Sequence, residues 1–177
     1  MQQDAARSGH RPPLGRHAAA LPQGGGSLRL SPRERALVGP ELRAFVTQMP
    51  PGAARDGYQA LLDALDVGEV GGPHLGRLEA FLELALSTGR IKERHGQHGE
   101  DEVRRVFART PRGQAQTASV NEVTKALSGL IDQPLRNLQL TTTRPGSYRL
   151  IIESDQLRVS LALAPAGAYV ESVEVTV

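Results

Sequence analysis

The hydrophobic pattern changes its period at Pro134, and this change constrains the fold more than any other feature of the sequence. Before Pro134, apolar residues recur at the three- and four-residue spacing that is typical of amphipathic helices. After it, Leu, Ile and Val alternate with polar residues in four separate runs, as expected for half-buried strands. We therefore predict an α+β fold class, in which an N-terminal helical bundle of about five helices packs on a C-terminal four-stranded antiparallel β-meander.

The alternation also predicts how the first strands pair. A turn at Arg144-Pro145-Gly146 joins the first hairpin, and a two-residue loop at Ser154-Asp155 joins the second. The predicted opposite pairs are Leu140 with Leu150, Leu138 with Ile152, Ile152 with Leu157, and Leu150 with Val159. All these apolar side chains then share one face of the sheet, and polar side chains occupy the other.

The last hairpin needs one irregularity to keep its apolar residues on that face. A turn at 165–167 sets Leu161 opposite Val170, but continued regular pairing misplaces Val173. One extra residue near Glu171–Ser172 restores Val173 opposite Val159. We therefore predict a β-bulge at this point.

The helical part begins with a capping-box spacing at Ser31, followed by Pro32 at the first helical position. We expect the Gly39-Pro40 pair to interrupt this first helix. Polar loops are predicted at 68–73 and 95–99. Further helices are predicted at about 53–66, 74–94, 100–109 and 116–131.

The N-terminal residues have a different composition. Residues 1–30 lack periodicity, are rich in Pro and Gly, and carry four arginines against one aspartate. We predict a disordered basic Pro/Gly-rich tail over 1–30 and a single α+β domain over 31–177. Within that domain, 31–131 is the helical part and 135–177 is the meander.

Composition limits the chemistry available. The chain has no cysteine, so no thiolate nucleophile or cysteine-bound metal is possible. Lys92 and Lys125 are its only lysines, and this preference for arginine indicates a bacterial source with a GC-rich genome. No stretch approaches the roughly 20 apolar residues of a membrane span, so we expect a cytoplasmic protein.

The helix predicted at 74–94 has an apolar stripe too broad to be covered from one direction. We interpret it as the central core helix or, alternatively, as part of a dimer contact. The interface residues of that alternative are Leu75, Leu78, Phe81 and Leu84.

Basic residues around the predicted 95–99 loop form a candidate phosphate or nucleic-acid site. Antiparallel packing of the two flanking helices would gather their side chains. Acidic neighbours dilute the charge, and no aromatic residues interleave for base stacking. The residues are Arg90, Lys92, Arg94, Arg104, Arg105, Arg109 and Arg112.

His95 and His98 are the candidate metal ligands, since two imidazoles near carboxylates suit zinc. The flexible glycine-containing loop favours an ordinary solvated segment instead. No nucleophile elbow, Walker pattern or dinucleotide fingerprint occurs, and we predict neither a catalytic residue nor a cofactor.

These observations favour a non-enzymatic interaction or assembly module, such as an adaptor or accessory subunit. Its partner would be another protein or a second copy of the chain. The alternatives are a nucleic-acid-binding accessory protein that uses the 90–112 arginines and a carrier of a small apolar ligand.

Overall fold

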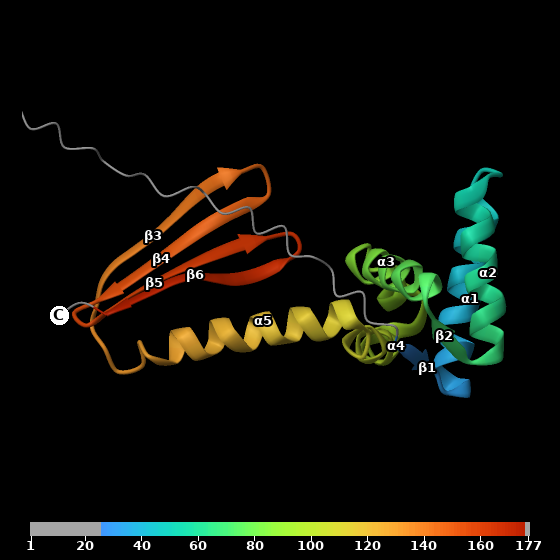
Figure 1. Cartoon of the computed structure of the whole chain (residues 1–177), viewed down its shortest axis with the longest axis horizontal. Coiled ribbons are helices and arrows are strands. Elements are labelled where there is room, and N and C mark those ends of the chain that lie inside the picture. Colours follow the sequence, from blue (N-terminus) through green and yellow to red (C-terminus); the bar gives the residue numbers. More distant parts are fainter. Residues whose placement is uncertain (1–25, 176–177) are drawn as a thin grey trace, which may run out of the picture.

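A computed structural model of the chain describes residues 26–175 (Figure 1). Five helices are followed by a four-stranded antiparallel sheet, which confirms the predicted α+β class. The predicted disorder of residues 1–25 lies outside the described residues. The elements are β1 (Ser27–Arg29), α1 (Pro32–Gln48), α2 (Ala53–Val67), β2 (Glu69–Gly71), α3 (Pro73–Ser87), α4 (Arg90–Ala108), α5 (Pro111–Ser128), β3 (Leu135–Arg144), β4 (Ser147–Ser154), β5 (Leu157–Ala164) and β6 (Gly167–Val175).

Helix α1 starts as predicted but does not break in its middle. The Ser31 hydroxyl accepts a hydrogen bond from the Glu34 amide, and the Glu34 carboxylate accepts one from the Ser31 amide. The expected interruption at Gly39-Pro40 is wrong, because the helix continues through Pro40 to Gln48. Pro40 removes one backbone hydrogen bond, but the residues around it, including Leu42, are buried against the other helices.

Ordered structure begins before the predicted boundary at Ser31. Residues 27–29 form strand β1, which pairs antiparallel with strand β2 inside the segment predicted as a loop. Leu28 and Leu30 are 7% and 5% exposed. Burying two leucines stabilises this segment on the helical core, so residues 27–30 do not belong to the tail.

The predicted single helix over 74–94 is two helices, because the chain breaks at Thr88 and Gly89. Helix α3 ends at Ser87, and Gly89 in the left-handed conformation (φ 69°) turns the chain into α4. The predicted loop at 95–99 is instead a kink within α4, where Gly96 has φ 67°. Because a residue without a Cβ adopts this conformation at low cost, one glycine bends the helix without opening a loop.

Pro111 starts helix α5 rather than merely ending α4. The Thr110 hydroxyl accepts a hydrogen bond from the Gly113 amide and caps the helix. Helix α5 therefore begins five residues before the predicted start at Gln116 and ends at Ser128. It runs from the helical bundle to the sheet (Figure 1).

The main hydrophobic core lies entirely within residues 28–106 and is nearly all aliphatic. Helices α1 to α4 and the β1–β2 pair bury the side chains of Leu28, Leu30, Val38, Leu42, Val46, Leu61, Leu62, Leu65, Val70, Leu75, Leu78, Phe81, Leu82, Ala85, Ile91, Val103 and Val106. No helix in the described residues is both long and apolar enough to span a membrane.

The sheet has the predicted order β3-β4-β5-β6. Leu138 opposite Ile152 and Leu140 opposite Leu150 are confirmed. The predicted bulge is also confirmed, since Leu161 pairs with Val170 while Val159 pairs with Val173. Glu171 is thus the extra residue on β6.

The register of the second hairpin differs from the prediction by two residues. Ile152 lies opposite Val159, and Leu150 lies opposite Leu161. The Ser154 hydroxyl accepts hydrogen bonds from the Gln156 and Leu157 amides, and this closes a longer turn than the two-residue loop expected. A shift of two residues leaves every side chain on its predicted face.

We expect Leu42→Ala to lower the free energy of unfolding by about 2–5 kcal/mol, because Leu42 is fully buried in the helical core. Val67→Ala is the control, since Val67 is 81% exposed, and it should change stability by no more than about 0.5 kcal/mol. Urea unfolding followed by far-ultraviolet circular dichroism measures both. Equal stability losses would contradict the position of the core.

Candidate interaction surface

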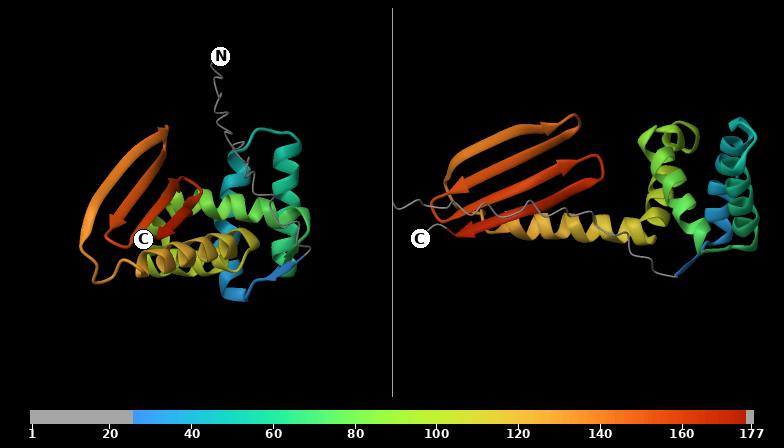
Figure 2. Two further views of the ribbon diagram at one scale, coloured as in Figure 1. Left: turned by 60° about the vertical axis from the view of Figure 1, so that its left-hand side comes forward. Right: turned by 45° about the horizontal axis from the view of Figure 1, so that its top comes forward.

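Helix α5 covers only part of the apolar face of the sheet. It contacts β6 extensively and β5 less, and no other helix in residues 26–175 makes an extensive contact with the sheet. Figure 2 (left) shows β5 and β6 beside α5, with β3 farthest away. An α-helix is about 10 Å across, whereas four strands span roughly 15–20 Å, so one helix leaves half of the face open.

The exposure of the side chains differs between the covered and the uncovered half of the sheet. On β5, Val159 and Leu161 are 0% and 2% exposed, whereas on β3, Leu138 and Leu140 are 65% and 60% exposed. Tyr148 of β4 is exposed, and Leu150 is half-buried. We call the side chains of Leu138, Leu140, Tyr148 and Leu150 the open face.

Strand β3 also presents an unpaired edge. It is ten residues long and pairs only with β4. Between Arg136 and Arg144 it carries no charged residue and no proline, and both are features that usually protect an edge strand. The register irregularities of this strand lie near its two ends. The opposite edge, β6, carries the bulge at Glu171 and lies beside α5.

The other face of the sheet is polar, and most of its charged side chains pair with one another. Arg149 donates to both Glu171 oxygens, at 2.6 and 3.0 Å, and Ser160 donates to the same carboxylate. Hydrogen bonding from Arg149 outweighs partial burial and lowers the pKa of Glu171. Glu153 pairs with Arg158 at 3.2 Å. This face is therefore suited to water.

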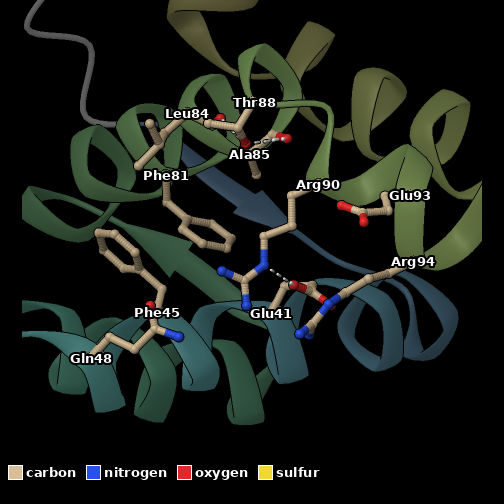
Figure 3. A pocket seen from close by; sticks show the side chains of 10 residues that line it. All are labelled: Glu41, Phe45, Gln48, Phe81, Leu84, Ala85, Thr88, Arg90, Glu93 and Arg94. Carbon is tan, nitrogen blue, oxygen red and sulfur yellow. Dashed lines mark hydrogen bonds and ion pairs between the residues drawn. The ribbon is translucent and has the colours of Figure 1, made fainter.

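A pocket of about 740 Å³ lies between α1, α3 and α4 (Figure 3). Phe45 and Phe81 form one wall, with ring centroids 5.6 Å apart, and Tyr58 packs edge-on against Phe45 at 5.2 Å. Half of the six aromatic residues of the chain therefore gather here. Leu84, which is 46% exposed, lies at the rim.

The polar side of this pocket is organised around Glu41, whose side chain is only 4% exposed. His95 Nε2 lies 3.0 Å and Arg94 Nη1 3.2 Å from its Oε1, and Arg90 Nε lies 3.2 Å from its Oε2. Oε2 nevertheless accepts no hydrogen bond of good geometry within the described residues. Burial raises the pKa of Glu41, but hydrogen bonds from His95 and Arg94 and the charges of Arg94 and Arg90 lower it overall.

The predicted basic patch does not form on antiparallel helices, because its residues follow one helix, α4, into the start of α5. Most of them pair with carboxylates. Arg90 and Arg94 contact Glu41, Arg104 contacts Glu100, Arg109 contacts Glu34, and Arg112 contacts Glu83. In the part of the chain that the structure describes, Lys92 and Arg105 have no ion pair.

His95 and His98 turn to different partners. His95 contacts Glu41, whereas His98 lies beside Arg33 and 3.8 Å from Glu102. The kink at Gly96 lies between them. Among residues 26–175, no three His, Asp or Glu side chains come together as a metal site.

The structure buries three of the four predicted interface residues within the chain itself. Leu75, Leu78 and Phe81 are at most 6% exposed and belong to the helical core, so only Leu84 faces outward. The breadth of this apolar stripe is explained by packing against α1, α2 and α4. The alternation in the sequence does not mark Leu138 and Leu140 as surface residues. The one signal that could have found them is a comparison of widths, since a single helix is too narrow to cover four strands.

Comparisons with protein-family models, with curated proteins and with solved structures give no match.

We expect the free energy of unfolding to fall in acid. The pKa values of Glu41 and Glu34 are lowered in the folded protein, so the unfolded chain binds more protons. Their stabilisation is present above the unfolded value of 4.5 and is lost as pH falls through the lowered folded values. Glu41→Gln should cost about 1–2 kcal/mol at pH 7, and this cost should shrink in acid.

Urea unfolding between neutral pH and acid measures this difference. Glu174→Gln is the control, because Glu174 is exposed on β6, and it should change the free energy of unfolding at pH 7 by no more than about 0.5 kcal/mol. A cost of Glu41→Gln that stays constant down to low pH would contradict the role of the Glu41 carboxylate.

Proposed function

We propose that the protein is a non-enzymatic interaction or assembly module, an adaptor or accessory subunit of bacterial origin, that docks on a polypeptide through its C-terminal sheet. The observation that carries this proposal is the exposure of Leu138 and Leu140, at 65% and 60%, on the apolar face of the sheet. Contiguous exposed apolar patches larger than a few hundred Å² mark interaction sites on soluble proteins. The arginine-rich composition supports the bacterial origin.

The β3 edge supports the same proposal. Its ten residues offer backbone donors and acceptors directly beside the open face. A docked polypeptide would gain main-chain hydrogen bonds from the edge and apolar contacts from the leucines. Both kinds of contact suit a protein partner better than a nucleic acid, whose backbone requires positive charge.

The nucleic-acid alternative has weaker support. Five of the seven basic residues proposed for it pair with carboxylates of the chain itself. An arginine held by an internal carboxylate must give up that contact to bind a phosphate. A partner that docks on the open face breaks no such contact.

A single-cysteine cross-linking experiment tests the proposed docking surface. The chain has no cysteine, so Leu140→Cys can carry a benzophenone label at one defined position. We expect irradiation of the labelled protein with an extract of its source cells to give one discrete adduct, identified by mass spectrometry. The reason is that position 140 lies on the open face.

Gln139→Cys, labelled in the same way, is the matched control, because residue 139 neighbours residue 140 but points to the polar face. It should give little of that adduct. Equal adducts from both positions, or none from position 140, would contradict docking through the open face.

A specific observation also favours a second candidate function, the carriage of a small apolar ligand. Glu41 lines the pocket that Phe45 and Phe81 wall. Its buried Oε2 atom lies 3.2 Å from Arg90 Nε but accepts no hydrogen bond of good geometry within residues 26–175. Buried acceptors are normally satisfied. A ligand with an apolar body and an N–H or O–H donor would complete this site.

Native mass spectrometry tests the carrier function. We expect a bound small molecule on the purified chain and its loss in Leu84→Trp, since an indole at the pocket rim would occupy the ligand volume. Val67→Trp, at an exposed position away from the pocket, should retain the added mass. A bare chain, or loss of ligand in both variants, would contradict this function.

A further inference from the structure

We propose that the ligand of the pocket between α1, α3 and α4 is an amphipathic acid, whose carboxylate binds the guanidinium groups of Arg90 and Arg94. Its apolar body would lie against Phe45 and Phe81. This inference rests on the carrier function proposed above. It adds a negatively charged group to the apolar body and the hydrogen-bond donor named there.

Two arginines share one carboxylate in this pocket, so one positive charge is left over. Arg90 and Arg94 lie one turn apart on α4, and each contacts Glu41 at 3.2 Å. Glu41 is ionised at neutral pH, because its hydrogen bonds and the arginine charges lower its pKa. Its single charge balances only one of the two arginines. By contrast, Arg109 and Arg112 each have a carboxylate of their own.

Both guanidinium groups also keep N–H groups that a ligand can use. Arg90 approaches Glu41 through Nε and Arg94 through Nη1, and neither donates a hydrogen bond to any other group within residues 26–175. Their side chains are 34% and 52% exposed, whereas that of Glu41 is 4% exposed. A ligand that enters the pocket therefore meets the arginine N–H groups before it reaches Glu41.

The position of these groups distinguishes a small ligand from a nucleic acid. Figure 3 shows the guanidinium of Arg90 inside the pocket, with Glu41 on one side of it and Phe81 and Phe45 on the other. A nucleic-acid phosphate outside the pocket would have to draw this side chain away from Glu41. A small carboxylate inside the pocket can accept from the terminal N–H groups while Nε stays beside Glu41. Arginine binds carboxylates in this way through strong, charge-assisted hydrogen bonds.

The other wall of the pocket requires an apolar body on the same ligand. The rings of Phe45 and Phe81 have centroids 5.6 Å apart, and Leu84 and Ala85 continue the apolar lining. The volume of about 740 Å³ lies within the usual range for pockets that bind small molecules. A ligand with a charged head and an alkyl or aryl tail would therefore satisfy both walls.

The single unit of excess charge favours a carboxylate over a phosphate monoester. A carboxylate carries one negative charge and neutralises the arginine that Glu41 leaves unbalanced. A phosphate monoester carries about −1.5 to −2 at neutral pH and would add repulsion against Glu41. Glu93, the other acidic residue of the lining, is exposed, and water screens its charge.

A matched pair of compounds tests this inference on the full chain. 2-Hydroxyoctanoate and 1,2-octanediol have the same alkyl tail and the same hydroxyl donor, but only the first has a carboxylate. We expect isothermal titration calorimetry to show that the acid binds at least about tenfold more tightly than the diol, because hydrogen bonds to charged groups contribute that much to affinity.

Arg94→Gln should remove most of this preference for the acid, a loss of roughly tenfold. Arg104→Gln is the matched control. It makes the same change of charge on the same helix, but Arg104 lies beyond the Gly96 kink and pairs with Glu100, so the preference should remain. Circular dichroism checks that both variants fold. If Arg94→Gln does not fold, Leu84→Trp at the pocket rim must abolish binding of the acid instead.

The outcomes separate this inference from the carrier function. Equal binding of acid and diol to the wild type, with both lost in Leu84→Trp, would overturn the carboxylate and leave the carrier function standing. Binding of the acid that is unchanged in Arg94→Gln, or kept in Leu84→Trp, would also overturn the inference. If neither compound binds, the inference fails, and the native mass spectrum of the purified chain decides the carrier function separately.

Discussion

The width of one helix against four strands is the constraint on which the rest of the structure depends. Helix α5 has 18 residues and is long enough to follow the sheet, at about 27 Å, but it is wide enough for only two strands. It therefore buries Val159 and Leu161 completely and leaves Leu138 and Leu140 exposed. The same helix is tied to the bundle, since Arg112 at its start contacts Glu79 and Glu83 of α3. The sheet and the bundle thus share one helix, while the main core remains within the bundle.

Within the bundle, a buried carboxylate holds together elements that are far apart in sequence. Glu41 lies on α1, and its three cationic or imidazole partners lie within the first six residues of α4. The cost of burying a charge is offset only when its partners approach closely, and this fixes how α4 lies against α1. The turn at Gly89 and the kink at Gly96 bound the segment that approaches Glu41. Beyond the kink, His98 faces Arg33 and Glu102 instead.

The sequence predicted the sheet more accurately than the helices, and the reason is physical. Alternation fixes which face each strand residue occupies, so even the Glu171 bulge follows from the positions of Leu161, Val170 and Val173. The alternation does not determine the register of the second hairpin, because that register depends on the hydrogen bonds of the Ser154 side chain. Helix ends depend on single residues whose effect is set by packing. Pro40 lies inside a helix, Pro111 starts one, and Gly96 bends one.

The open face could not be predicted from the alternation of apolar and polar residues, because packing decides which apolar side chains stay exposed. Leu138 and Leu161 occupy equivalent positions in the alternation, but Leu161 lies on an inner strand beside α5, whereas Leu138 lies on the edge strand away from it. The two candidate sites of the chain also lie in different parts of the molecule, one on the sheet and one in the helical bundle. Because the main core does not include the sheet, a partner on the open face leaves the Glu41 pocket between α1, α3 and α4 undisturbed. Docking at the sheet and ligand binding in the bundle are therefore compatible in one molecule.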